Sequence, residues 1–340
     1  MKDFFKLVTP YFYGSEKRYA RWGGLWLLVL SQASTTYGYL FIQWNRRFFD
    51  ALEARNASEF YWQCGVFICI MIFYVVTFSF TRYSGQKYAL RWRMWMTNSA
   101  LTKWLHDADR GKLEGSDQRI QEDLMRFTLI FERFFLDCFN AILLILLFTP
   151  LLFTETKGLT LFGISQGWIL FGASVIYTAI GMLISAKIAN PLINLEYNNQ
   201  KLEAELRYNL VHVRDGADKP QSFFSVLLDG IAFNYNQMYR RQKNFNLWQK
   251  TYDQLSYLIP FILIGGQYFS GALTLGALMQ VRSTFSRIRN SMAYLLDHYT
   301  ELTELLAISK RVVEFYECAQ IDLTATPELA GKGKIIAAGA

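Results

Sequence analysis

The residues of this chain that could do chemistry are carboxylates placed at the edges of long apolar stretches. A carboxyl group in a partly dry environment can take up a proton from one side of a barrier and release it on the other. Four residues qualify: Glu122, Glu132, Glu196 and Glu203. Glu196 and Glu203 are seven positions apart, so on a helix they share a face and lie ~10 Å apart along it. These four are candidate proton-binding groups.

The same carboxylates also have a structural interpretation. Glu196 and Glu203 stand among polar residues, where a carboxylate is usually part of a solvated helix face or the partner of a cation such as Arg207. Glu132 lies at an apolar edge beside Arg133, so a proton-binding role and simple pairing are both open.

Charged residues in other apolar stretches form a second set. Arg282 and Arg289 are seven positions apart and share a helix face, and Asp137 lies deep in an earlier stretch. A charge at membrane depth is costly unless it is hydrated or paired. The arginines are therefore expected to face a cavity or a partner subunit. They could contact carboxylates of a bound solute, or pair with Asp137 or Glu132, and we expect Asp137 to be the buried partner of such an arginine.

Three acidic residues follow the arginines with i, i+4, i+7 spacing. They are Asp297, Glu301 and Glu304. This spacing places them on one helix face, and a wet face is favoured over a proton site.

Six apolar stretches must position these charges. Each runs close to the ~20 residues that a hydrocarbon core of ~30 Å requires. They begin near Trp22, Cys64, Phe134, Leu161, Leu255 and Leu273. A content of 52% hydrophobic and 17% aromatic residues is also high for a soluble chain of 340 residues. The sequence predicts an all-α membrane protein with an amphipathic elbow over 1–21, a six-span domain over 22–317 and a cytoplasmic tail over 318–340.

Two connections between the stretches are long, polar and rich in helix-forming residues. They run from Ser84 to Phe127 and from Lys187 to Asp253. Turn signals divide each of them, at Asp107 to Ser116 in the first and at Asp215 to Pro220 in the second. We therefore expect the spanning helices to continue beyond the membrane as helical hairpins, over about 84–127 and 187–253.

Basic residues collect on one side of these stretches. The N-terminal segment and both long connections carry many Lys and Arg, whereas the third and fourth stretches are joined by a segment with only Lys157. By the positive-inside rule both termini are cytoplasmic, although Arg46, Arg47 and Arg55 in the first outer loop run against the bias. The rule explains the net charge of +7 without a nucleic-acid partner.

Motifs for metals, cofactors and nucleotides are absent from the sequence. The four cysteines lack C-x-x-C spacing and the three histidines are isolated from one another, so we expect no disulfide, metal or cofactor. No G-x-x-x-x-G-K-[ST] loop occurs, and Gly331-Lys-Gly-Lys334 lacks both its spacing and its hydroxyl residue. We expect the chain not to be an enzyme.

Several segments together resemble the SbmA/BacA-like peptide transporter family, over roughly residues 35 to 317. They are Phe48-Phe-Asp-Ala-Leu52, Gln118-Arg-Ile-Gln-Glu-Asp-Leu-Met-Arg-Phe127, Leu195-Glu-Tyr-Asn-Asn-Gln-Lys-Leu-Glu203, Leu273-Thr-Leu-Gly-Ala-Leu-Met279 and Ala307-Ile-Ser-Lys-Arg-Val-Val-Glu-Phe315. The resemblance implies an ABC-exporter-like (type IV) transmembrane domain without an ATPase. It further implies a homodimer in the bacterial inner membrane that imports peptides or other bulky solutes on the proton gradient.

The same resemblance bears on the candidate residues. The four glutamates are similar to acidic positions that the family uses as a ladder lining its cavity. Arg282 and Arg287 stand where uncharged residues are expected, whereas Arg289 matches. Several of the motifs are shared with bacterial ABC half-transporters of the fatty-acid-transporter type, so the alternative is the membrane subunit of an ABC transporter whose ATPase is a separate chain.

Overall fold

The computed structural model describes residues 2–105, 116–161, 163–216, 218 and 220–318. These residues belong to two compact units, which are described separately below. The first unit comprises Met1–Leu151 and Thr274–Ala340, and the second comprises Leu152–Leu273.

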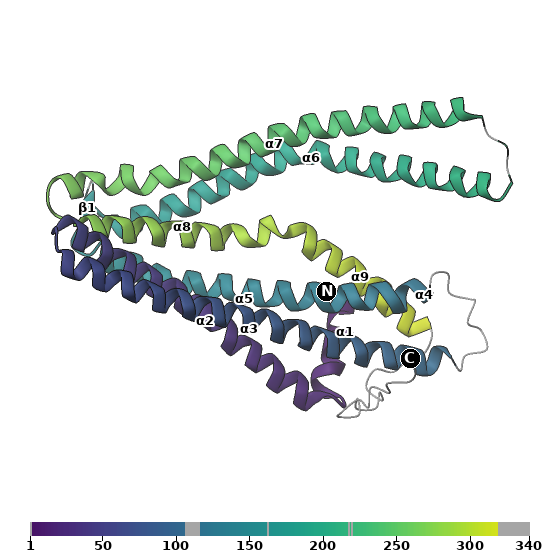
Figure 1. The fold of residues 1–340 in the computed structure, drawn as a ribbon, viewed down its shortest axis with the longest axis horizontal. Helices are drawn as coiled ribbons and strands as arrows, with labels where there is room; N and C mark the ends of the chain where they lie inside the picture. The colour runs from purple at the N-terminus through teal and green to yellow at the C-terminus, as the bar shows by residue number, and fades with distance from the viewer. Residues whose placement is uncertain (1, 106–115, 162, 217, 219, 319–340) are drawn as a thin grey trace. The chain divides into compact units, whose positions relative to one another are not determined.

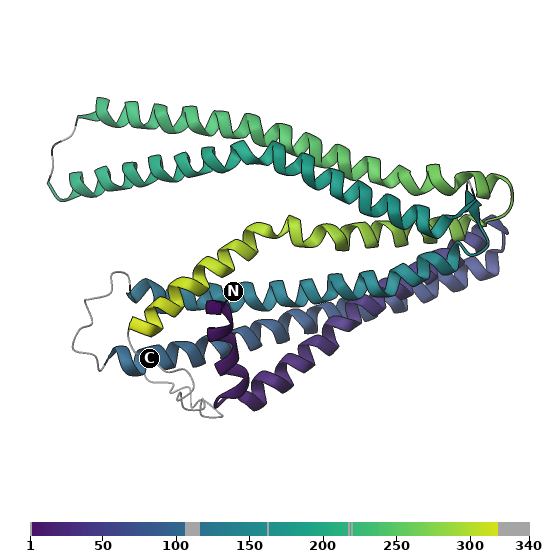
Figure 2. The ribbon, with the colours of Figure 1, turned by 180° about the vertical axis from the view of Figure 1, so that it is seen from behind.

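The first unit is helical, and its elements come from both ends of the chain. They are α1 (Lys2–Tyr13), α2 (Lys17–Glu53), α3 (Ala57–Trp104), α4 (Ser116–Gln118), a π-helical turn η1 (Arg119–Asp123), α5 (Leu124–Glu155, which ends in the second unit), α8 (Leu275–Asp297) and α9 (Tyr299–Cys318). Helix α8 packs along α2, and α9 contacts α1 and η1. Figure 2 shows the bend where α8 leads into α9.

The second unit is a long helical hairpin (Figure 1) that a short β-ribbon precedes. Strands β1 (Thr160–Leu161) and β2 (Ile164–Ser165) pair antiparallel, with Thr160 opposite Ser165. Helices α6 (Gln166–Arg214) and α7 (Gln221–Phe269) then run side by side. The spanning stretch expected from about Leu161 therefore begins a few residues later, because the ribbon occupies that position.

Four helical segments are long and apolar enough to cross a membrane. They are Lys17–Glu53, Ala57–Thr102, Arg119–Glu155 and Gln166–Arg214. The fifth and sixth apolar stretches of the sequence fall on the long helices α7 and α8, which do not reach the same mean hydropathy. Spans at these two positions, and hence six in all, stay a prediction.

The predicted extension of helices through the long connections is confirmed. Helix α3 has 48 residues, and α6 and α7 have 49 each. At 1.5 Å per residue these helices measure ~72–74 Å, more than twice the ~30 Å of a hydrocarbon core. The predicted turn over 107–116 lies almost entirely outside the described residues, as does the Gly331–Lys334 segment of the tail.

An aromatic core lies between α1 and α3 in the first unit. The side chains of Tyr11, Trp92 and Trp95 are fully buried, and the Tyr11 and Trp92 rings stack with centroids 4.7 Å apart. Tyr11 of α1 is thus packed against α3, and the role of residues 1–21 as an amphipathic elbow stays a prediction. Glu16 follows in the turn after α1, where its fully buried carboxylate accepts a hydrogen bond from Arg91 Nε at 2.9 Å.

Helix α2 supplies the N-terminal caps of α8. The backbone N–H of Leu275 donates to Glu53 Oε2 at 2.8 Å, and that of Gly276 donates to Asp50 Oδ1 at 3.1 Å. These contacts satisfy amide groups that the first turn of any helix leaves without an intrahelical partner. A side chain at position 276 would collide with Asp50 and with the carbonyl oxygen of Arg46, so only glycine permits this approach. Two of the sequence segments that carry the family resemblance meet here.

Candidate functional site

Glu132 lies on α5 against the backbone of α3. A Cβ atom on Gly85 would collide with Glu132 Oε1, so the glycine makes room for the carboxylate. The charges within electrostatic range of Glu132 are Arg82 on α3 and Asp137 and Arg133 on α5. Within the described part of the chain, no Lys or Arg approaches Glu132 closely enough to form an ion pair.

Asp137, one and a half turns further along α5, shares part of this environment. Its charged neighbours are Arg82, His298, Arg133 and Glu301. The sequence had suggested an arginine of the sixth stretch as its partner. Arg82 of α3 lies within electrostatic range of both carboxylates, and pairing of Asp137 with an arginine of the sixth stretch stays a prediction.

His298 occupies the junction between α8, which ends at Asp297, and α9, which begins at Tyr299. Its Nδ1 lies 3.4 Å from Glu301 Oε1, and its ring centroid lies 4.4 Å from that of Tyr294. Because the helix bends here, Asp297 belongs to a different helix from Glu301 and Glu304. We call Arg82, Glu132, Asp137, His298 and Glu301 the charge cluster.

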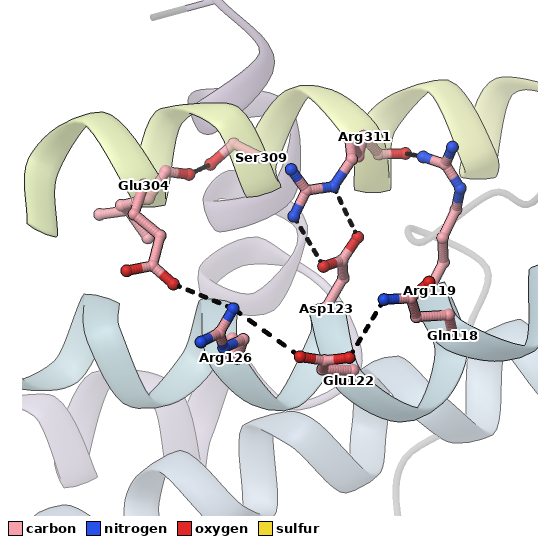
Figure 3. A network of polar contacts seen from close by, with 9 residues as sticks. Gln118, Arg119, Glu122, Asp123, Arg126, Glu304, Ser309 and Arg311 are labelled. Carbon is pink, nitrogen blue, oxygen red and sulfur yellow. Dashed lines mark hydrogen bonds and ion pairs between the residues drawn. The ribbon is translucent and has the colours of Figure 1, made fainter. Parts of the chain in front are cut away.

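A second polar network joins the start of α5 to α9 (Figure 3). The guanidinium of Arg311 donates two hydrogen bonds to Asp123, at 2.8 and 2.9 Å. The side chain of Asp123 is only 8% exposed, whereas that of Arg311 is 43% exposed. The hydrogen bond to Asp123 raises the pKa of the Arg311 guanidinium above its ordinary value. Asp123 lies in η1, and π-helical turns are uncommon and frequent at functional positions.

Glu122 belongs to the exposed rim of this network. It accepts a hydrogen bond from Gln118 Nε2 at 3.2 Å and lies 3.7 Å from Arg126 Nη1. Arg126 in turn lies 3.3 Å from Glu304 Oε1. Glu122 is thus surrounded by hydrogen-bonding and charged partners, and Glu304 is paired across to α5 (Figure 3). The proton-binding role of Glu122 stays a prediction.

The other two glutamates lie in the second unit, on α6. Glu196 is exposed and lines a cavity of about 610 Å³ together with Tyr197, Met238 and Phe245. Glu203 is exposed as well, and Tyr235 on α7 donates a hydrogen bond to its Oε1 at 3.4 Å. The structure thus divides the candidates between two units: Glu122, Glu132 and Asp137 in the first, Glu196 and Glu203 in the second.

Arg282 and Arg289 both make contacts along their own helix. Arg282 Nη2 donates to Ser283 Oγ at 3.3 Å, and Arg289 Nη2 donates to Asn290 Oδ1 at 2.6 Å. Arg289 is buried and Arg282 is half-buried. Their assignment to a substrate cavity stays a prediction.

Several residues of these networks were not identified from the sequence. The sequence assigned no site role to Arg82 or His298. Asp123 and Arg311 appeared only inside the longer segments that carry the family resemblance. The i, i+3 spacing of His298 and Glu301 was a readable local signal. The pairing of Asp123 with Arg311 had no such signal, because 188 positions separate them.

Comparison with known proteins places the chain among membrane transporters. Residues 17–320 match the SbmA/BacA-like family. The chain is 30% identical to an uncharacterised ABC transporter ATP-binding protein of Synechocystis over 80% of this chain and 42% of that protein. It is 27% identical to the chloroplastic ABC transporter D family member 2 of Arabidopsis thaliana over 92% of this chain and 45% of that protein.

The name of a third relative places that relative in the inner membrane. The inner membrane ABC transporter ATP-binding protein YddA of Escherichia coli is 24% identical over 89% of this chain and 59% of that protein. The chain spans about half the length of these relatives and covers only their membrane part. Its long apolar helices and its match to the family over most of its length agree with one another. The chain belongs to the SbmA/BacA-like family of multi-pass membrane transporters, which is related to ABC transporters.

Proposed function

We propose that this chain imports peptides or other bulky solutes across the bacterial inner membrane, driven by the proton gradient. It would act as a homodimer that alternates between outward-open and inward-open states, with both termini in the cytoplasm. The observation that carries the proposal is the charge cluster. Two carboxylates on an apolar helix, Glu132 and Asp137, lie within electrostatic range of Arg82 and Arg133, and Asp137 also lies within range of His298. Ionisable groups in a membrane helix are functional by default.

Proton binding in the charge cluster would change the balance of charge at a helix junction. A proton on Asp137 would remove its attraction to Arg82 and change its electrostatic interaction with His298. Because His298 is the residue between α8 and α9, this change alters the forces on the bend between these helices. Protonation would thereby bias the angle between α8 and α9.

Further proton-binding groups would lie outside the charge cluster, at Glu122, Glu196 and Glu203. Glu122 would exchange protons with water at the rim of the Asp123 network. Glu196 and Glu203 would do so on α6, where the cavity beside Glu196 offers an apolar wall of Met238 and Phe245 to a solute.

The homodimer is supported by the exposed apolar side chains of the second unit. Leu183 is 73% exposed and Ile262 is 76% exposed, and such surfaces need lipid or a second copy of the chain to cover them. Mass photometry in nanodiscs should show two copies. A monomer that transports at the normal rate would refute the homodimer.

The coupling experiment uses proteoliposomes without ATP and an inward proton gradient. The probe is a mixture of fluorescently labelled peptides of three to ten residues. We expect uptake that collapses with a protonophore, and we expect Glu132→Gln and Asp137→Asn to reduce it while the protein stays folded. These changes keep the size and hydrogen-bonding capacity of the side chains but remove their titration.

Two control variants separate proton coupling from simple charge loss. Glu314→Gln removes an exposed carboxylate that is paired only weakly with Lys310, at 3.9 Å, and should leave uptake unchanged. On α6, Glu203→Gln removes the charge and should reduce uptake, whereas Tyr235→Phe removes the hydrogen bond to Glu203 but keeps the charge and should not. Unchanged uptake and pH dependence in Glu132→Gln and Asp137→Asn would refute the role of the charge cluster.

A second candidate function is the membrane subunit of an ABC transporter whose ATPase is a separate chain. The names of the relatives favour it, since all three are ABC transporters and two are called ATP-binding proteins. Uptake in the same proteoliposomes that requires ATP and an added ATPase subunit, and that survives a protonophore, would establish this alternative.

A further inference from the structure

Arg287 on α8 is a cation enclosed by membrane helices. Its guanidinium lies against Gly38 on α2, where an added Cβ atom would meet Arg287 Nη1 at 2.8 Å. It also lies 5.6 Å from the ring centroid of Phe148 on α5. Gly38 and Phe148 belong to segments that are apolar and long enough to cross a membrane. The glycine therefore forms a notch into which the guanidinium fits.

The other groups near Arg287 carry no formal negative charge. Tyr37 and Tyr74 lie within electrostatic range, and their rings stack with centroids 4.1 Å apart. Among the described residues, no Asp or Glu forms an ion pair with Arg287. This differs from Arg91 and Arg311, which each hold a carboxylate at 2.9 Å or less.

Arg287 lies twelve residues from the start of α8, which corresponds to ~18 Å along the helix. If α8 begins at the outer surface, this distance places the guanidinium near the middle of a ~30 Å hydrocarbon core. A charge at that depth is costly unless water or a counter-ion reaches it. The residue as a whole is half-buried, so it is not fully enclosed by its neighbours.

We propose that Arg287 binds the anionic group of the transported solute, a carboxylate, phosphate or sulfate. This inference rests on the proposed transport function and narrows its substrate class to solutes that carry such a group. Guanidinium recognises these anions through two parallel hydrogen bonds. Phe148 and the notch at Gly38 hold it in place, because the aromatic ring attracts its positive charge and the notch fixes its position.

The test measures binding rather than transport, so that it can succeed or fail independently of the energy source. The purified full chain in zwitterionic nanodiscs is incubated with an equimolar mixture of peptides of three to ten residues, each present as the free acid and as the C-terminal amide. Mass spectrometry measures the ratio of the two forms retained. We expect the free acids to be retained about tenfold more strongly than the amides.

Three variants and a control identify the group responsible. Arg287→Gln should lower the ratio to about one, and Arg287→Lys should leave an intermediate ratio because it keeps the charge but loses the paired hydrogen bonds. Gly38→Ala keeps the charge and displaces the guanidinium from its notch, so it should lower the ratio as well. Arg240→Gln, which removes an exposed arginine of α7, should leave the ratio unchanged. Gel filtration checks that each variant is folded.

Each alternative result has a definite meaning. Equal retention of acids and amides by the unmodified chain, or retention of neither form, overturns the proposal even if proton-driven uptake is observed. In nanodiscs that contain phosphatidylglycerol, loss of bound phosphatidylglycerol in Arg287→Gln with no change in peptide ratio would assign the site to a lipid headgroup and overturn it too. A tenfold preference that depends on Arg287 supports it even if uptake proves to require ATP.

Discussion

The ion pair between Asp123 and Arg311 predicts an asymmetric response to mutation. Arg311→Met leaves the carboxylate of Asp123, which is 8% exposed, without its cation. Asp123→Asn leaves a guanidinium that water can reach, since the side chain of Arg311 is 43% exposed. Removing one partner of a buried pair costs about 3–5 kcal/mol when a buried charge remains. Losing a hydrogen bond to a charged group costs about 1.5–3 kcal/mol.

We therefore expect Arg311→Met to lower the free energy of unfolding by about 4 kcal/mol and Asp123→Asn by about 2 kcal/mol. The double variant has no unpaired charge, so it should be less destabilised than the sum, with a coupling energy of about 2 kcal/mol. Reversible unfolding in mixed micelles, followed by tryptophan fluorescence, measures the free energy of unfolding of the unmodified chain, of both single variants and of the double variant. Trp92 and Trp95 in the adjacent core provide the signal.

A matched control lies in the same π-helical turn. Glu122 is 38% exposed and pairs with Arg126 at 3.7 Å, so Glu122→Gln should cost less than about 1 kcal/mol. Equal losses in Arg311→Met and Asp123→Asn, or a coupling energy below about 0.5 kcal/mol, would refute the reasoning that burial of Asp123 sets the magnitude.

Two further predictions concern the ends of α2. Gly276→Ala should destabilise the first unit by about 3 kcal/mol, because the new methyl group collides with Asp50 and displaces the N–H group that Asp50 caps. Thermal unfolding measures the loss. The control Gly265→Ala on α7 should show none, since an added Cβ atom there meets nothing within 4 Å. Glu16→Gln should cost about 2 kcal/mol by weakening the bond from Arg91 to a fully buried acceptor, and limited proteolysis should then cleave the turn after α1 faster, whereas an unchanged cleavage rate would contradict a fixed elbow.

Local signals in the sequence predicted most of the helical architecture. The break after α6 was readable from the turn signals at Asp215 to Pro220, and in the structure Gly216 there adopts a φ of 101°, a conformation that glycine tolerates. The continuity of α3, α6 and α7 through polar segments was readable from helix-forming composition. The β-ribbon between α5 and α6 was not, since strands of two residues carry no periodicity.

The candidate site was predictable only in part, for a physical reason. Its place at the edge of an apolar stretch identified Glu132, and depth in the same stretch identified Asp137, because an ionisable group there has few tolerable environments. Their neighbours depend on how helices pack: Arg82 of α3 lies within electrostatic range of both, and His298 at the bend after α8 lies within range of Asp137. The capping of Gly276 by Asp50 spans 226 positions and likewise required the three-dimensional structure.

The hairpin of α6 and α7 has the mechanical properties of a lever. Tyr177 and Tyr252 each donate a hydroxyl hydrogen bond to the other's carbonyl oxygen, at 2.5 and 3.2 Å, and their rings stack at 4.4 Å. These contacts tie the two helices together at one level of a hairpin whose helices are ~74 Å long. A rotation of only ~10° at one end of a helix of that length displaces the other end by ~13 Å. A modest change of angle is therefore amplified along the hairpin, and fluorophores at its tip would report tilts too small to detect at its base.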